Sequence, residues 1–128
     1  MILDDTYNAT PESTMAALDI LNEVKGLHIA VLGDMLELGE YEQQGHEQVG
    51  KHAAAKVDIL IAVGPRSKNM VEAAIQAGLS AGSVFWFEDA LQALDPLKKY
   101  LKEGTVALVK GSHGMRMERI TNSLEEIK

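Results

Sequence analysis

The sequence predicts an α/β fold in which a parallel sheet carries helices on both faces. Two observations lead to this fold class. Short apolar runs alternate with helix-like segments along the whole chain, an order that is typical of repeated βαβ units. The runs at residues 29–32 and 59–63 are apolar at every position, which is typical of strands buried on both faces. The length of 128 residues suits one domain with one core.

Local signals place the elements of the first half. A strand begins at Ile2. Thr10 followed by Pro11 is a typical helix start, with the threonine as N-cap and the proline at the first helical position. Gly26 is expected to end this helix. After the second strand, a helix is expected over residues 41–56, weakened by two internal glycines.

The second half continues the alternation. The remaining elements are expected at residues 67–77 (helix), 84–87 (strand), 88–102 (helix), 105–109 (strand) and 115–127 (helix). Pro96 is expected to split the fourth helical stretch or to start its second part. The aromatic residues at 85–87 are expected to serve packing rather than base stacking.

Composition narrows the class of protein. The formal net charge of −7 argues against nucleic acid or an anionic membrane as the main partner. The absence of cysteine excludes disulfides and thiolate metal sites. His46 and His52 are spaced unfavourably for shared metal binding, and no metal site is expected. No apolar run approaches the ~20 residues of a membrane span, and we expect a cytoplasmic protein.

Polar clusters follow three of the predicted strands. Because the carboxyl ends of parallel strands lie at one edge of a sheet, we expect these clusters to form one cleft. The third cluster has a lysine and a serine between an apolar strand and a helix, an arrangement that suits an anion. The residues expected to bind substrate or nucleotide are Asp5, Tyr7, Asn8, Asp34, Met35, Glu37, Lys110, Gly111, Ser112 and His113.

Each cluster also has a structural explanation. Asp5 can cap the turn before the first helix, and Ser112 can cap a solvated loop. A ligand-binding role is favoured for these two clusters because several polar side chains gather after an apolar strand. For Asp34 taken alone, capping of the next segment is the preferred interpretation.

The three motifs together resemble a known family. Residues 4–13, residues 31–39, and residues 109–112 with 115–118 are similar in order and spacing to the C-terminal domain of the Mur ligases, in the branch that adds D-alanyl-D-alanine. The resemblance implies a Rossmann-like three-layer sandwich, with helices on both faces of a mostly parallel sheet of five to six strands. It also implies that residues 1–128 are an isolated C-terminal domain, without the N-terminal and central ATP-binding domains.

The function that this resemblance implies is ATP-dependent amide ligation in cytoplasmic peptidoglycan synthesis. In that family, ATP phosphorylates the carboxylate of UDP-MurNAc-tripeptide, and the amine of D-alanyl-D-alanine then displaces phosphate. ATP and Mg²⁺ are bound mainly by the central domain, against which this domain closes. The chain is therefore expected to contribute to dipeptide and nucleotide binding, to hold no catalytic residue of its own, and to be inactive alone.

The resemblance also suggests roles for single residues. Asp5 matches the acidic residue that the ligase superfamily has at the head of this domain, and is expected to orient nucleotide or the incoming ammonium. Tyr7 and Asn8 are expected to contact nucleotide or dipeptide beside it. His113 departs from the arginine that is more usual in its loop, which weakens the expected anion binding there.

Charge complementarity divides the expected dipeptide site into two ends. Asp34 and Glu37 suit the ammonium end of D-alanyl-D-alanine, whereas Lys110 and Ser112 suit its carboxylate end.

Two other classes of protein fit the alternation of strands and helices less well. A phosphorylation-controlled receiver domain shares the acidic pair and the lysine, but it needs an aspartate after the third strand. The segment at residues 63–67 contains no acid. A dinucleotide-binding module needs a Gly-x-Gly-x-x-Gly turn after a strand, and the sequence has none.

Overall fold

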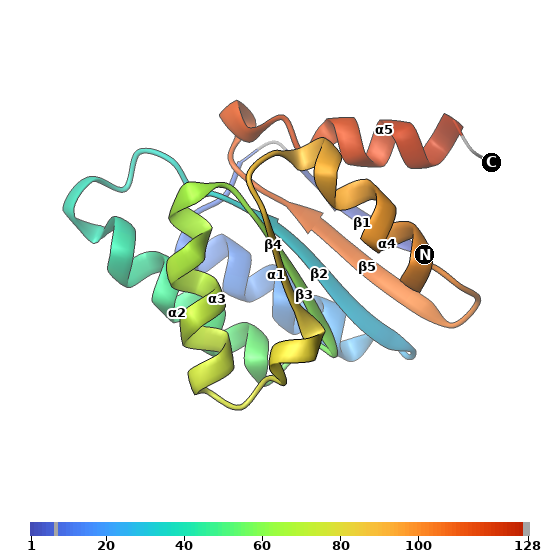
Figure 1. The fold of residues 1–128 in the computed structure, drawn as a ribbon, viewed down its shortest axis with the longest axis horizontal. Coiled ribbons are helices and arrows are strands. Elements are labelled where there is room, and N and C mark those ends of the chain that lie inside the picture. The colour runs from blue at the N-terminus through green and yellow to red at the C-terminus, as the bar shows by residue number, and fades with distance from the viewer. Residues whose placement is uncertain (7, 127–128) are drawn as a thin grey trace.

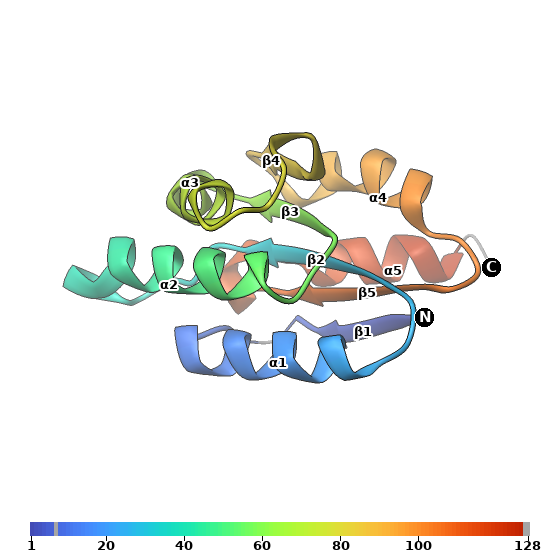
Figure 2. The same cartoon turned by 90° about the horizontal axis from the view of Figure 1, so that it is seen from below.

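A computed structural model describes residues 1–6 and 8–126 of the chain. Within them, five strands form one all-parallel sheet in the order β1-β5-β2-β3-β4 (Figure 1). The strands are β1 (Ile2–Asp5), β2 (Leu27–Gly33), β3 (Ile59–Val63), β4 (Val84–Phe87) and β5 (Thr105–Lys110). Figure 2 shows them stacked from β4 at the top to β1 at the bottom. The α/β fold and the parallel sheet are confirmed.

Helices cover both faces of this sheet. The helices are α1 (Pro11–Glu23), α2 (Glu42–Ala54), α3 (Lys68–Gln76), α4 (Leu94–Tyr100) and α5 (Glu118–Glu126). Short 3₁₀ turns are η1 (Gly39–Tyr41), η2 (Pro65–Ser67), η3 (Ala81–Ser83), η4 (Ala90–Ala93) and η5 (His113–Met115). Helices α1, α2 and α3 pack on one face, and η4, α4 and α5 pack on the other (Figure 1).

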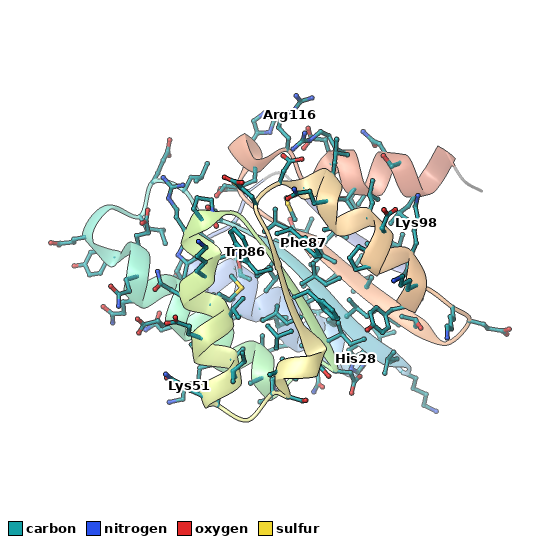
Figure 3. The ribbon with its side chains drawn as sticks, in the orientation of Figure 1. His28, Lys51, Trp86, Phe87, Lys98 and Arg116 are labelled. Atoms are coloured by element: carbon teal, nitrogen blue, oxygen red, sulfur yellow. The ribbon has the colours of Figure 1, made fainter. Side chains whose placement is uncertain are left out.

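Alternate residues of the central strands feed two separate cores. In β2, Ala30 and Leu32 join the core under α1–α3, while Ile29 and Val31 join the core under α4 and α5. The side chains of the aromatic strand β4 divide in the same way. Trp86 packs in the core under α1–α3, whereas Phe87 packs in the core under α4 and α5 (Figure 3). The uniformly apolar strand sequences are thus explained by burial on both faces.

The two glycines inside α2 allow close packing of its neighbours. A Cβ on Gly50 would lie 2.1 Å from the carbonyl oxygen of Met70 in α3. A Cβ on Gly45 would lie 2.9 Å from Cγ of Pro11 in α1. The glycines that were expected to weaken this helix therefore let three helices share one face of the sheet.

The predicted start of the closing helix is wrong. The closing helix was expected from residue 115, but α5 begins at Glu118. Arg116 has a left-handed backbone with φ 53°, which interrupts the helix after the η5 turn. Pro96 lies in the first turn of α4 and so begins the second part of the fourth helical stretch, as expected. Residue 127, the expected helix end, is outside the described residues.

The strand order creates a crevice beside β5. Strands β1 and β2 lead into helices on one face, whereas β5, which lies between them, leads into α5 on the other face. Loops that diverge in this way leave room for a ligand at the carboxyl ends of the strands. Receiver-type domains instead follow the order β2-β1-β3-β4-β5, so the topology also excludes that alternative.

In the part of the chain that the structure describes, no helix has both the length and the apolar character needed to cross a membrane.

Candidate functional site

Lys110 joins the end of β5 to the loop that follows β1. Its Nζ lies 2.6 Å from Oδ2 of Asp5 and donates to the carbonyl oxygen of Asn8 at 2.9 Å. The lysine is 3% exposed, whereas the Asp5 side chain is 48% exposed. Lys110 was expected to contact a phosphate or carboxylate of a ligand. The structure instead buries its charge and neutralises it with Asp5, whose other face remains open to solvent.

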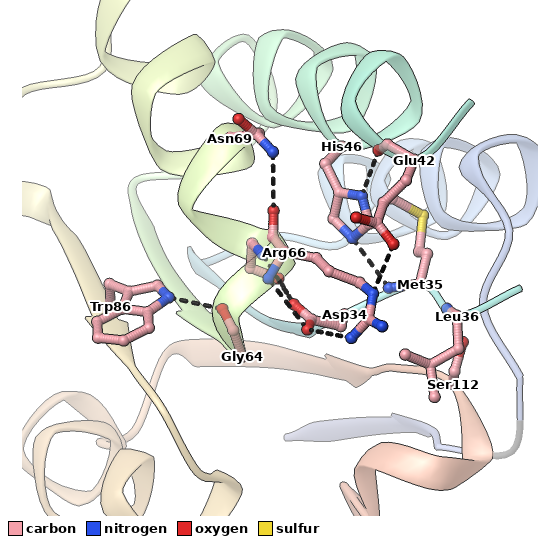
Figure 4. Close-up of polar contacts among 11 residues, drawn as sticks. Asp34, Met35, Leu36, Glu42, His46, Gly64, Arg66, Asn69, Trp86 and Ser112 are labelled. Carbon is pink, nitrogen blue, oxygen red and sulfur yellow. Dashed lines mark hydrogen bonds and ion pairs between the residues drawn. The ribbon is translucent and has the colours of Figure 1, made fainter. Parts of the chain in front are cut away.

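Ser112 joins the loop after β5 to the loop after β2. Its Oγ accepts a hydrogen bond of 2.8 Å from the backbone N–H of Leu36 (Figure 4). Its own N–H donates to the carbonyl oxygen of Asp34 at 3.2 Å. The hydroxyl that was expected to face a ligand therefore acts first as a connection between two loops.

Asp34 is fully buried and caps a turn that belongs to another strand. Its Oδ1 accepts from the N–H and the hydroxyl of Ser67, at 2.8 and 2.7 Å. Its Oδ2 accepts from the N–H of Arg66 at 3.1 Å. Carboxylates stabilise helix starts by accepting from unpaired N–H groups in this way. Asp34 was expected to meet a ligand ammonium or to cap the next segment; it caps the turn after β3 instead.

Gly64 is required beside this buried carboxylate. Its φ is 106°, and a Cβ there would lie about 2.5 Å or less from the carboxyl atoms of Asp34. The carbonyl oxygen of Gly64 also accepts from Nε1 of Trp86 at 2.7 Å (Figure 4). A single turn after β3 thus connects Asp34 to the aromatic strand β4.

Arg66 connects the same turn to α2. Its Nε donates to Oε1 of Glu42 at 2.6 Å, and its Nη1 lies 3.5 Å from Oδ2 of Asp34 (Figure 4). The hydrogen bond to Glu42 raises the pKa of the Arg66 guanidinium, with a smaller contribution from Asp34. The two carboxylates therefore hold this cation across the gap between the loops after β2 and β3.

The loop after β2 is anchored at every residue but one. Met35 is buried in the core under α1–α3, and the Leu36 side chain packs over Gly114, where a Cβ would lie 2.8 Å from it. Leu38 packs against α2. Between them, Glu37 is exposed and has a left-handed φ of 64°. Non-glycine residues adopt this conformation rarely, and when they do the surrounding structure holds them in it.

The three clusters meet at a small hollow of about 130 Å³. Its lining consists of Asn8, Leu36, Glu37, Ser112, His113 and Gly114. Glu37 supplies a carboxylate and His113 an imidazole ring to the same opening. Among the described residues, no hydrogen bond or ion pair engages the carboxylate of Glu37. The hollow therefore offers an available carboxylate to a small cationic group.

The structure divides the predicted site residues into two groups. Those exposed to solvent are Asp5, Asn8, Glu37 and His113. Those buried are Asp34, Met35, Lys110, Gly111 and Ser112. Tyr7 lies outside the described residues. The predicted polar edge is present, and the buried Asp34, Lys110 and Ser112 have their side-chain polar atoms hydrogen-bonded within the chain. Contact of any of these residues with a ligand stays a prediction.

Sequence reasoning missed the residues that support this edge. These are Glu42, His46, Arg66 and Ser67, which lie on α2 or in the turn after β3. No local spacing indicates them, because their partners come from a different strand. In the described residues, no group of three histidine, aspartate or glutamate side chains could hold a metal ion.

The fold and the hollow define an α/β domain that has a small polar hollow at the carboxyl ends of its strands. Residues 1–113 match the family described as Mur ligase, glutamate ligase domain. The UDP-N-acetylmuramoyl-tripeptide–D-alanyl-D-alanine ligase of Escherichia coli is 38% identical over 98% of this chain, and that of Bacillus subtilis is 31% identical over 98%. This chain belongs to the Mur ligase family and corresponds to its C-terminal domain.

Solved structures agree with this assignment. The MurF ligase of Thermotoga maritima, in complex with ADP, matches 98% of this chain with a TM-score of 0.81 and 29% identity. MurF of Acinetobacter baumannii matches 94% with a TM-score of 0.82 and 30% identity. This chain covers 28% and 27% of those two chains, and 27% and 28% of the Escherichia coli and Bacillus subtilis ligases. It therefore spans about a quarter of the length of its relatives.

Proposed function

We propose that this chain serves as the C-terminal domain of a cytoplasmic ligase that joins D-alanyl-D-alanine to UDP-MurNAc-tripeptide in peptidoglycan synthesis. The observation that carries this proposal is the 38% identity to the Escherichia coli ligase of that name across 98% of the chain. The 31% identity to the Bacillus subtilis ligase of the same name supports it. The N-terminal and central domains of such an enzyme would supply the remaining sites.

The proposed reaction has two steps. A carboxylate oxygen of the tripeptide attacks the γ-phosphorus of ATP, and ADP leaves. The amine nitrogen of the dipeptide then attacks the acyl carbon, phosphate leaves, and the nitrogen loses a proton. This chain contains no Gly-x-x-x-x-Gly-Lys-Ser/Thr loop, so the main ATP contacts belong to the central domain in this proposal. Its described residues form no metal cluster, and we assign no Mg²⁺ step to them.

The contribution of this chain is to bind the incoming dipeptide at the hollow. Glu37 is the exposed carboxylate that would pair with the dipeptide ammonium, since Asp34 is buried and fully engaged. His113 lines the same hollow and would face the carboxylate end, since Lys110 is neutralised by Asp5. A carboxylate at one end of the hollow and an imidazole N–H donor at the other would orient a zwitterionic ligand. Asp5, held by Lys110 and half exposed, would face the nucleotide.

A domain exchange tests the function. We would replace the matching segment of the Escherichia coli ligase by residues 1–128 and measure phosphate release that depends on D-alanyl-D-alanine. The proposal expects activity from the exchanged enzyme. Removing the charge of Glu37 with Glu37→Gln should raise the KM for dipeptide about tenfold or more, because one charge-assisted hydrogen bond is worth roughly 1.5–3 kcal/mol.

Two controls make the exchange decisive. Glu103→Gln removes an exposed carboxylate of the same charge just before β5, at the opposite end of the sheet from the hollow, and should leave the KM for dipeptide unchanged. Circular dichroism reports whether the exchanged enzyme is folded. A folded exchange enzyme that binds ATP but releases no phosphate with dipeptide would contradict the proposal.

A further inference from the structure

We infer that His46 is a positioning residue, which holds the loop after β2 so that the carboxylate of Glu37 lies at the hollow. The identity of the ligand rests on the proposed function, whereas the positioning role rests on the structure alone. His46 lies on α2, is fully buried, and touches no part of the hollow itself.

Both ring nitrogens of His46 are engaged. Nε2 lies 3.0 Å from the backbone nitrogen of Met35, and Nδ1 lies 2.7 Å from the carbonyl oxygen of Glu42 (Figure 4). A backbone N–H can only donate and a carbonyl oxygen can only accept. Nε2 must therefore accept and Nδ1 must carry the proton. The geometry fixes His46 as a neutral ring in a single tautomer.

This ring supplies an acceptor that the backbone does not. In the described structure, the N–H of Met35 donates to His46 and the N–H of Leu36 donates to Ser112. The two acceptors come from α2 and from the loop after β5, on either side of the β2 loop. A buried N–H that loses its acceptor is costly, so the loop would move to find another partner.

Glu37 follows these two held amides directly. Its left-handed φ of 64° is unfavourable for a residue with a side chain, and it persists only while its neighbours are fixed. Met35 is two residues away along the chain, so a shift there would redirect the Glu37 carboxylate. His46 therefore acts on the hollow through the backbone, at a distance, without contacting a ligand.

A purely structural role for His46 as core filler makes different predictions. His46→Gln keeps an acceptor at about the reach of Nε2, whereas His46→Asn keeps an amide only near the position of Nδ1. Both remove the ring, and asparagine is one methylene group shorter than glutamine. If positioning matters, glutamine should rescue the loop and asparagine should not. If only filling matters, each variant should lower stability in proportion to the space it leaves, without a selective change in exchange of the Met35 amide relative to β3.

The experiment uses the 128-residue chain labelled with ¹⁵N. In the unmodified chain, the His46 ring should show a protonated Nδ1 and an unprotonated Nε2 in its nitrogen shifts. His46→Asn should speed hydrogen exchange of the Met35 amide at least tenfold relative to amides in β3, and should weaken binding of D-alanyl-D-alanine. His46→Gln should recover most of both losses.

A destabilised control separates positioning from general loosening. Val49→Ala creates space at a fully buried position on the same helix, where the side chain joins the core instead of the loop. It should lower the unfolding midpoint while leaving the Met35 exchange ratio and dipeptide binding unchanged.

The outcomes distinguish this inference from the proposed function. A proton on Nε2 in the unmodified chain would overturn the inference, as would equal exchange at Met35 in the glutamine and asparagine variants. Tight dipeptide binding in His46→Asn would also overturn it, because Glu37 would then not depend on the ring. If the unmodified chain binds no dipeptide at millimolar concentration while the exchange pattern holds, the dipeptide assignment fails and the positioning role is supported.

Discussion

The two ends of the sheet are built in different ways. At the carboxyl ends of the strands, buried N–H groups donate to side chains from distant segments, as with Ser67 to Asp34 and Met35 to His46. At the opposite end, the backbone closes the turns: Leu27 N–H donates to the carbonyl oxygen of Gly104 at 2.8 Å, and Gly26 has a φ of 133°. The carboxyl end of the sheet depends on buried side-chain acceptors that have no local substitute, whereas the opposite end depends mainly on backbone conformation.

This difference predicts which substitutions the chain tolerates. Loss of one of these side chains at the carboxyl end leaves buried donors without acceptors, and substitutions of this kind are among the most destabilising. Loss of a side chain at the other end exposes groups that water can satisfy. Addition of a side chain to a turn glycine is the change that should matter there.

The largest expected effect is at Asp34. Asp34→Ala leaves the N–H and hydroxyl of Ser67 and the N–H of Arg66 without their acceptor. We expect a loss of about 3 kcal/mol or more in the free energy of unfolding, measured in urea. Asp58→Ala is the matched change at the opposite end, where an exposed carboxylate accepts from His28 N–H. It should cost under about 1 kcal/mol; equal losses would contradict the comparison.

The pair of Asp5 and Lys110 should respond asymmetrically. Asp5→Ala leaves a lysine that is 3% exposed without its carboxylate, and we expect a loss of about 2–3 kcal/mol. Lys110→Met leaves Asp5 in contact with water and replaces the buried charge by an apolar chain, so the loss should be about 1 kcal/mol or less. Chemical unfolding of both variants checks this order. A larger loss for the methionine variant would show that Lys110 contributes stability beyond its pairing with Asp5.

The opposite end should be sensitive to added side chains. A Cβ at Gly26 would lie 2.3 Å from the carbonyl oxygen of Gly104, and its φ is 133°. We expect Gly26→Ala to cost about 2 kcal/mol in unfolding free energy. Gly104→Ala is the control, since its φ is 86° but nothing lies within 4 Å of the added atom; about 1 kcal/mol is expected from backbone strain alone. Equal thermal stability of the Gly26→Ala and Gly104→Ala variants would contradict this prediction.

The smallest effect concerns Asp89 and Arg119. Arg119 Nη2 donates to Asp89 at 2.9 Å, and this hydrogen bond lowers the pKa of the carboxyl group. A lowered native pKa stabilises the fold at pH values above the unfolded pKa, and this contribution disappears as pH falls through the native pKa. Arg119→Gln should raise the Asp89 pKa, seen by carboxyl ¹³C NMR. The stability change near neutral pH should be a few tenths of a kcal/mol, because the pair is solvent-exposed. An unchanged Asp89 titration would show that its backbone donors are sufficient.

The sequence predicts the sheet well because the burial of a strand can be recognised from its own consecutive residues. Uniform apolar runs and the Thr10–Pro11 helix start report on neighbouring residues, and the capping box at Thr10 is present in the structure. The polar edge was also predictable, since it follows from where parallel strands end. The support of that edge was not predictable. Asp34 and Ser67 are 33 residues apart, and Leu36 and Ser112 are 76 apart, so only the folded chain brings them together.

Strand order also predicts when the carboxyl edge of the sheet forms during folding. Strands β2, β3 and β4 pair with sequence neighbours, but β5 lies between β1 and β2, and Ile2 pairs with Ala107. Contacts between distant segments form late because they close long loops. We expect β1 and β5 to become protected from hydrogen exchange last during refolding, after β2 and β3. As the polypeptide emerges from a ribosome, β1 would wait for most of the domain to be synthesised, and the hollow would be completed only when folding ends.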